Sequence, residues 1–144
     1  MERWEADARF VQEKQQSETE FMFREDDTNH TERKKHDEFV REWGFSNFDI
    51  LDLNQAIAMF ILPRLRYYIT KTDSIPTELL KTDKAGNILN ETEAFQEWKQ
   101  ILHAICDGLH LYISKYNTGF SEEEQTLWKT AKKYLFKYFE HLWI

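Results

Sequence analysis

The chain has 144 residues, of which 41% are hydrophobic and 31% charged, and its formal net charge is −7. This length and balance fit one folded domain, and the acidic charge argues against general binding to nucleic-acid phosphates, which requires clustered lysine and arginine. With 4 Gly and 2 Pro the chain has too few turn residues for a β-sandwich or barrel, so we predict an all-α helical bundle of about three long helices plus short helices.

Residues 1–43 are predicted to form a charged N-terminal arm, which precedes a helical bundle domain at residues 44–144. A helix is expected over residues 2–16, and its apolar residues are Trp4, Phe10 and Val11. The sequence "EFMF" at residues 20–23 is a short hydrophobic segment between charged runs. Such an arm can fold back on its own core, exchange onto a neighbouring subunit or bind a partner, and we leave these three arrangements open.

The stretch "FSNFDILDLNQAIAMFILPRLRYYIT" predicts the first strong helix, which Asp52 or Asn54 can cap. One side of this helix is mainly apolar, and the residues that share it are Leu53, Ile57, Phe60, Ile61, Arg64 and Tyr68. Met59 and Leu62 extend the apolar surface nearly all round, which is typical of a helix buried at the centre of a bundle. Pro63 removes one backbone donor, so we expect a kink in the turn before it.

Arg64 lies on the apolar side of this helix, and a buried arginine needs a partner for its charge. One alternative is an ion pair with Asp49, Asp52 or an acidic residue of another helix. The other alternative is a pocket for a phosphate or a carboxylate. The candidate ligand-binding residues of such a pocket are Arg64, Arg66, Tyr67 and Tyr68.

A connection follows, in which Pro76 is expected to open a short helical turn and residues 85–87, Ala-Gly-Asn, indicate a second turn. The next helix is predicted to begin close to Asn90, which has capping-box spacing with Glu93, and to end near Tyr116. Its apolar stripe consists of Phe95, Trp98, Leu102, Ile105 and Leu109, with Ile101 and Tyr112 beside it.

The last helix is predicted from about Glu122 to the end of the sequence, because Ser121 and Glu124 have the spacing of a capping box. Its apolar stripe consists of Leu127, Ala131, Tyr134, Leu135, Tyr138 and Leu142. Since apolar residues continue to the last position, we expect this end to lie in an interface and the protein to be a homo-oligomer. The candidate interface residues are Phe139, Trp143 and Ile144.

Candidate metal ligands occur at the spacing i, i+4, i+7, which places them on one helix face, and these are His103, Asp107 and His110. This face is opposite the apolar stripe, so we favour a solvated polar face over a metal site, which would need a further ligand such as His30 or His36. Cys106 is interpreted as a small buried hydrophobic residue. The sequence contains no nucleophile elbow, P-loop, dinucleotide fingerprint or cysteine-pair motif, so we predict neither enzymatic activity nor a cofactor.

Four stretches occur in order within residues 43–144: "FSNFDILDLNQAIAMFILPRLRYYI", "SIPTELL", "EAFQEWKQILHAICDGLHLY" and "LFKYFEHLWI". Together they resemble a family of small uncharacterised proteins of tailed bacteriophages, for which "ILPRL" paired with the closing "KYF..LW" is the more specific signature. The chain departs from that pattern at Phe48-Asp49-Ile50, where the family more usually has a Trp, and the arm lies outside the match. The resemblance implies a phage source and no established activity.

We therefore expect a non-enzymatic phage protein that acts by binding in the host cytoplasm, with a host or defence protein as its partner. An acidic chain that is rich in aromatic residues suits a protein partner. Two alternatives stay open, namely a protein that binds and sequesters a nucleotide signal, and a virion or assembly protein. We expect no membrane association, because the longest apolar stretch, "AIAMFILP", is much shorter than the roughly 20 residues of a spanning helix, and no signal-peptide pattern opens the sequence.

Overall fold

The computed structural model describes residues 1–23 and 27–144, without the side chains of residues 27–29. Over these residues the regular structure is helical apart from one isolated bridge between Thr82 and Ile88. The helices are α1 (Arg3–Met22), α2 (Asp27–Trp43), α3 (Asn47–Leu51), α4 (Leu53–Lys71), η1 (Thr77–Leu79), α5 (Glu91–Lys115), α6 (Glu122–Lys137) and η2 (Phe139–His141).

The predicted all-α class is confirmed, but the described residues contain five helices longer than 15 residues rather than about three. Two of them, α1 and α2, lie in the region predicted as an arm. α1 extends six residues past the helix expected there and includes most of the "EFMF" segment. None of the described helices is both long enough and apolar enough to cross a membrane.

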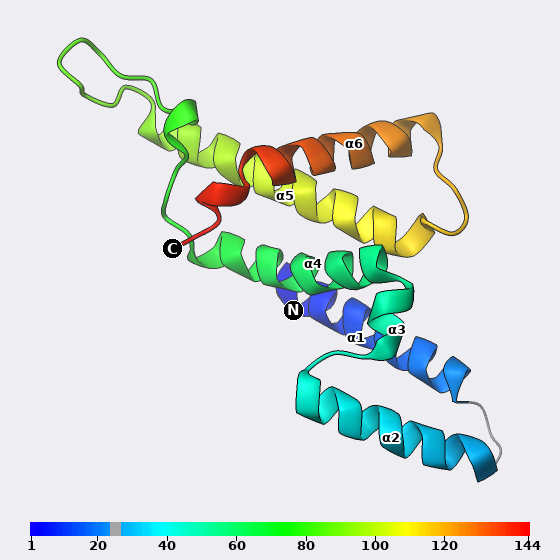
Figure 1. Cartoon of the computed structure of the whole chain (residues 1–144). Coiled ribbons are helices and arrows are strands. Elements are labelled where there is room, and N and C mark those ends of the chain that lie inside the picture. The colour runs from blue at the N-terminus through cyan, green and yellow to red at the C-terminus, as the bar shows by residue number, and fades with distance from the viewer. Residues whose placement is uncertain (24–26) are drawn as a thin grey trace.

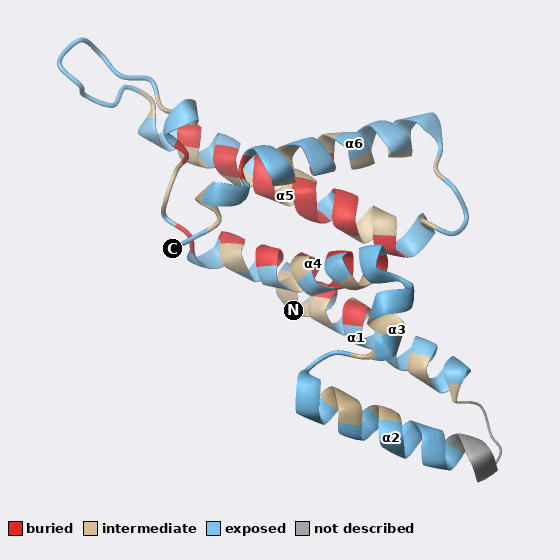
Figure 2. Ribbon diagram, viewed as in Figure 1, coloured by how far each residue is buried: buried red, intermediate tan, exposed pale blue. Residues whose placement is uncertain are grey.

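Helices α4 and α5 lie side by side, α6 packs on the other side of α5, and α1 packs against α4. Figure 1 shows α2 beyond α1, on the side away from α5 and α6. Of the three arrangements left open for the arm, α1 adopts the first, because its Val11 is part of the hydrophobic core. The buried positions follow the facing sides of α4 and α5 (Figure 2).

The core is centred on α5, as its amphipathic pattern predicted. Trp98, Leu102, Ile105 and Leu109 of the predicted stripe are all buried, while Phe95 is half-buried. Residues that complete the core from α4 are Ala58, Met59, Leu62, Leu65 and Ile69. α6 approaches α5 closely at a glycine: a Cβ built on Gly108 would lie 2.2 Å from the Cβ of Ala131.

The predicted apolar side of α4 is only partly the buried side, since Ile61 and Tyr68 pack against the core but the other four residues do not. Leu53, Ile57, Phe60 and Arg64 are exposed, and the side that faces the core carries Gln55, Ala58, Met59, Leu62, Leu65, Arg66 and Ile69. Since apolar residues surround this helix almost completely, their spacing does not decide which side is buried. The helix continues through Pro63, and the predicted kink there stays a prediction.

Both predicted turns in the connection between α4 and α5 are confirmed. Thr77–Leu79 form the helical turn η1 after Pro76, and Gly86 has the positive φ of +85° that favours glycine. The carboxylate of Asp83 accepts backbone hydrogen bonds from Ala85 and Asn87, both at 2.9 Å, and so closes this turn.

The predicted capping box at the start of α5 is wrong, because Asn90 makes no side-chain cap. Its Oδ1 instead accepts a hydrogen bond from the Lys81 amide at 2.7 Å, and its Nδ2 donates to the Leu79 carbonyl at 3.0 Å. Asn90 therefore joins the two ends of the loop that projects beyond η1 (Figure 1).

The predicted capping box of α6 is confirmed, since Ser121 Oγ accepts a hydrogen bond from the Glu124 amide and the Glu124 carboxylate accepts one from the Ser121 amide. The helix ends at Lys137, however, and does not run to the last residue. The backbone then turns through η2 toward the end of α4. There the hydroxyl of Tyr68 lies 3.1 Å from the His141 carbonyl and 3.0 Å from the Trp143 carbonyl, close enough to donate to either.

Candidate functional site

The buried arginine of α4 is Arg66, not Arg64. Arg66 is 4% exposed, and its Nε donates a hydrogen bond to Asp7 Oδ2 at 2.6 Å. Its Nη2 donates to Asp107 Oδ1 at 2.9 Å, so that one guanidinium joins α1, α4 and α5. Burial acts to lower the pKa of Arg66, but the hydrogen bonds to Asp7 and Asp107 outweigh it and the pKa is raised. This cluster therefore holds a permanently charged side chain inside the fold.

The candidate metal-binding face of α5 lies against this arginine cluster. His103 Nδ1 lies 2.9 Å from Arg66 Nη1 and 3.3 Å from Arg3 Nη1, and Arg3 also pairs with Asp107 at 3.1 Å. Burial, followed by the charges of Arg3 and Arg66, lowers the pKa of His103. Since the arginine nitrogens next to Nδ1 can only donate, Nδ1 of His103 accepts hydrogen bonds, and the lowered pKa favours the neutral ring.

The other candidate ligands do not complete a metal site in the described part of the chain. His110 stacks on the ring of Phe10 at 4.3 Å, and His36 contacts Ser46 instead of approaching α5. No group of three His, Cys, Asp or Glu side chains among the described residues lies close enough to hold a metal ion. The favoured interpretation of these residues as a solvated polar face is only partly correct, because Arg3 and Phe10 of α1 cover part of this face.

The four residues predicted to form an anion pocket are not brought together. Arg64 is exposed, with its guanidinium 3.8 Å above the Phe60 ring, and it donates a hydrogen bond to the Phe60 carbonyl. Arg66 faces the core, while Tyr67 packs edge-on against Trp4, with the ring centroids 4.9 Å apart. Tyr68 binds the backbone of the last residues, as described above. The predicted ion pair of Arg64 with Asp49 or Asp52 is also absent from the described residues.

Cys106 is fully buried, as predicted, and it has no reactive character. Burial raises the pKa of its thiol to about 12, although the nearby charge of Arg66 acts to lower it. A thiol with so high a pKa is almost wholly protonated at neutral pH and is a poor nucleophile.

The outer face of α4 is an exposed apolar stripe that points away from the core. We use the term α4 outer face for Leu53, Ile57, Phe60, Arg64 and Tyr67. Phe60 is 60% exposed and Ile57 50%, and the face continues past the start of α4 to exposed Ile50 and Leu51. The candidate interface residues Phe139, Trp143 and Ile144 are exposed as well.

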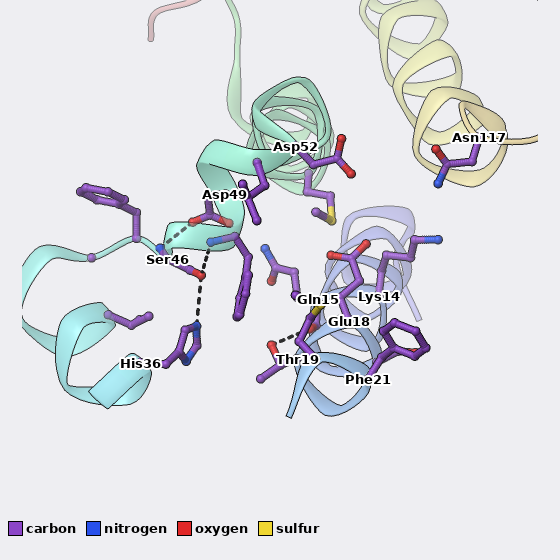
Figure 3. A pocket seen from close by; sticks show the side chains of 18 of the residues that line it. Lys14, Gln15, Glu18, Thr19, Phe21, His36, Ser46, Asp49, Asp52 and Asn117 are labelled. Atoms are coloured by element: carbon purple, nitrogen blue, oxygen red, sulfur yellow. Dashed lines mark hydrogen bonds between the residues drawn. The ribbon is translucent and has the colours of Figure 1, made fainter. Parts of the chain in front are cut away.

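A cleft of about 670 Å³ opens between the second half of α1 and the segment that leads from α2 through α3 into α4. Figure 3 shows Glu18 from α1 and Asp49 and Asp52 from the α3–α4 corner around this space, with Asn117 at the end of α5 nearby. Ser46 caps α3, and its hydroxyl lies 3.1 Å from Nε2 of His36, a contact that attaches the middle of α2 to the cleft wall.

Three carboxylates and one ammonium group line the cleft, apart from the imidazole of His36. Although Glu18 stays exposed, partial desolvation raises the pKa of its carboxyl group. The positive charge of Lys14 acts to lower this pKa, and the negative charges of Asp52 and Asp49 act to raise it. The cleft therefore carries an excess of negative charge around Glu18.

The sequence by itself does not predict this cleft. Its lining comes from residues 14–22, 36–59 and 116–117, which are far apart in the sequence. One local signal could have indicated part of it: Ser46 and Asp49 have capping-box spacing and form a complete capping box. That signal locates the first residue of α3, but it does not indicate which other segments of the chain lie opposite α3.

No protein-family model, curated protein or solved structure matches this chain. The resemblance to tailed-phage proteins therefore stays a prediction. Two features of the described residues are candidate binding sites, the α4 outer face and the cleft.

Proposed function

We propose that this protein acts without catalysis, by binding a protein partner through the α4 outer face. The observation that carries the proposal is the exposure of Leu53, Ile57, Phe60 and Tyr67 along one side of a helix whose opposite side is fully packed. A helix that is apolar on both sides is ordinarily covered on both. A protein partner supplies the cover that the described residues of this chain do not.

The size of the stripe fits the apolar centre of an interface. A large side chain that is about half exposed leaves on the order of 100 Å² in contact with solvent, so these four together leave roughly 400 Å². A standard interface buries about 800 Å² on each partner, and its centre is more apolar than its rim. Ile50 and Leu51 at one end of the stripe enlarge the apolar area further.

The charge of the face indicates the chemistry of the partner. α4 contains no acidic residue, although the whole chain has a net charge of −7. Arg64 is the cation in the middle of the stripe, and it is held flat on Phe60. We expect a partner with an apolar groove or helix face and a carboxylate placed to pair with Arg64. The phage resemblance leads us to expect this partner among host or defence proteins.

Site-specific photo-crosslinking in expressing host cells tests the proposal. Phe60 is replaced by p-benzoylphenylalanine, and Gln125, exposed on α6, is replaced in a matched control. We expect a defined heavier adduct from position 60 and none from position 125. Arg64→Glu should strongly reduce the adduct, whereas Lys129→Glu on α6 should not, with circular dichroism to confirm that each variant is folded.

The identity of the adduct decides between partners. A single host protein whose yield depends on Arg64 supports the proposal. An adduct that contains only two copies of this chain would replace it with self-association through the same face. The absence of any adduct from position 60 would refute it.

A further inference from the structure

The cleft between α1 and the α3–α4 corner has the size and the walls of a small-ligand site. Its volume of about 670 Å³ lies within the range of roughly 300–1,000 Å³ that is usual for such sites. Aromatic walls come from Phe45, Phe48 and Tyr116, and Met59 and Leu51 add aliphatic surface. These walls suit the apolar or aromatic body of a ligand.

The charged groups of the cleft favour a cation over an anion. Two of its three carboxylates are already engaged, because Asp49 accepts a hydrogen bond from the Ser46 amide at 2.8 Å and Asp52 accepts one from the hydroxyl of Tyr116. Glu18 forms no ion pair with any residue that the structure describes. Lys14 lies one turn earlier on α1 and is the cleft's only lysine or arginine among the described lining residues.

The surroundings of Glu18 contain a second unsatisfied polar group. The amide of Gln55, which is 1% exposed, lies beside Glu18 and acts as a hydrogen-bond donor that lowers the pKa of Glu18. Yet neither polar atom of Gln55 completes a hydrogen bond with a described residue. An unsatisfied buried amide is costly. Gln55 is thus a weak internal donor to Glu18 from outside the cleft lining, and it leaves the carboxylate open to a stronger partner on the cleft side.

We propose that the cleft binds an organic cation, namely an ammonium or guanidinium group carried on an apolar or aromatic body. Glu18 receives the cation, since neither an ion pair nor a complete hydrogen bond with a described residue engages it, whereas Asp49 and Asp52 already accept hydrogen bonds. The aromatic walls add the attraction of a cation for the face of a ring. A phosphate or carboxylate ligand would instead meet the repulsion of three carboxylates. The cleft is therefore unsuited to the nucleotide signal considered above as an alternative.

Two sources supply this chemistry, a free amine and a lysine or arginine side chain of a peptide. Isothermal titration calorimetry on the full chain separates them, with tryptamine as the free amine and a capped Trp-Lys dipeptide as the peptide. N-acetyltryptamine has the same aromatic body without the charge and is the control ligand. Glu18→Gln removes the receiving charge. Glu13→Gln removes a charge from an exposed residue of the same helix that does not line the cleft.

We expect tryptamine or the dipeptide to bind, and N-acetyltryptamine to bind more weakly by about tenfold or more, because a hydrogen bond to a charged group contributes at least that factor. Glu18→Gln should lower the affinity by a similar factor, and Glu13→Gln should leave it unchanged. Tighter binding of the dipeptide would assign the cation to a protein partner, and tighter binding of tryptamine would assign it to a small molecule.

Several results would overturn the proposal. These are equal affinity for the charged and the acetylated ligand, an unchanged affinity in folded Glu18→Gln protein, or no binding of either cation. None of them bears on the α4 outer face, whose test uses other residues and another readout.

Discussion

Removal of the buried arginine should destabilise the fold mainly through the acid it leaves behind. In Arg66→Met, the side chain of Asp7 stays only 10% exposed and loses its ion-pair partner, whereas Asp107 is 49% exposed and can be solvated by water. Removal of one member of a buried ion pair costs about 3–5 kcal/mol. In a domain of this size that loss corresponds to a melting temperature lower by roughly 10–15 °C.

A double-mutant cycle tests whether the loss of stability comes from the ion pair between Asp7 and Arg66. Asp7→Leu should cost less than Arg66→Met, because Arg66 keeps its 2.9 Å hydrogen bond to Asp107. The double variant Asp7→Leu with Arg66→Met should be more stable than Arg66→Met alone by about 2 kcal/mol, since no unpaired charge is then buried. Arg64→Met serves as the matched control, and because Arg64 is exposed its loss should cost less than about 1 kcal/mol.

The free energy of unfolding is measured by urea titration followed by circular dichroism at neutral pH. If the effects of the two single substitutions simply add in the double variant, Asp7 and Arg66 are not energetically coupled. If Arg66→Met costs no more than Arg64→Met, the carboxylate of Asp7 is not desolvated in the folded protein. Either result would refute the argument that this ion pair fastens α1 to α4.

Three further predictions concern packing, capping and titration. Gly108→Ala should destabilise the protein by about 1–3 kcal/mol, because its Cβ would lie 2.2 Å from that of Ala131; adding Ala131→Gly should recover most of the loss in urea unfolding. Ser121→Ala should cost about 1 kcal/mol by removing the cap of α6, while thermal unfolding of the control Ser114→Ala should change little. The pKa of Glu18 is raised in the folded state, so its charge opposes folding above that pKa and is relieved as the pH falls through it. Glu18→Gln should therefore remove the stability that is gained as the pH falls through this raised pKa toward the ordinary value of 4.5. Unfolding titrations at several pH values measure this, and an unchanged pH profile would contradict the raised pKa.

Local signals in the sequence determined much of the second half of the fold. The extent of α5 follows from apolar spacing that favours one face clearly, and the start of α6 follows from its capping box. These signals act between residues no more than about one helical turn apart, so they have the same effect whatever the rest of the chain does. The same locality explains why the turn at Gly86 was predictable.

The orientation of α4 was decided only by tertiary structure. Its apolar residues lie on nearly every side, so spacing alone could not choose between Arg64 and Arg66 as the buried arginine. The choice depends on Asp7, which lies 59 residues away, and on Asp107, which lies 41 residues away. The end of α6 is a similar case, because the hydroxyl of Tyr68 binds backbone carbonyls 73 and 75 residues later.

The cleft also belongs to the tertiary structure. Glu18 on its own looks like an ordinary surface acid of a helix, with Lys14 one turn earlier, and nothing near it in the sequence indicates the negative charges of Asp49 and Asp52. The raised pKa of Glu18 depends in part on the negative charges of Asp52 and Asp49, which approach it from the α3–α4 corner. The sequence thus indicated the long helices α4, α5 and α6, because helix formation depends on near neighbours. Only the packing of those helices decided which charges meet, because that depends on residues far apart in the chain.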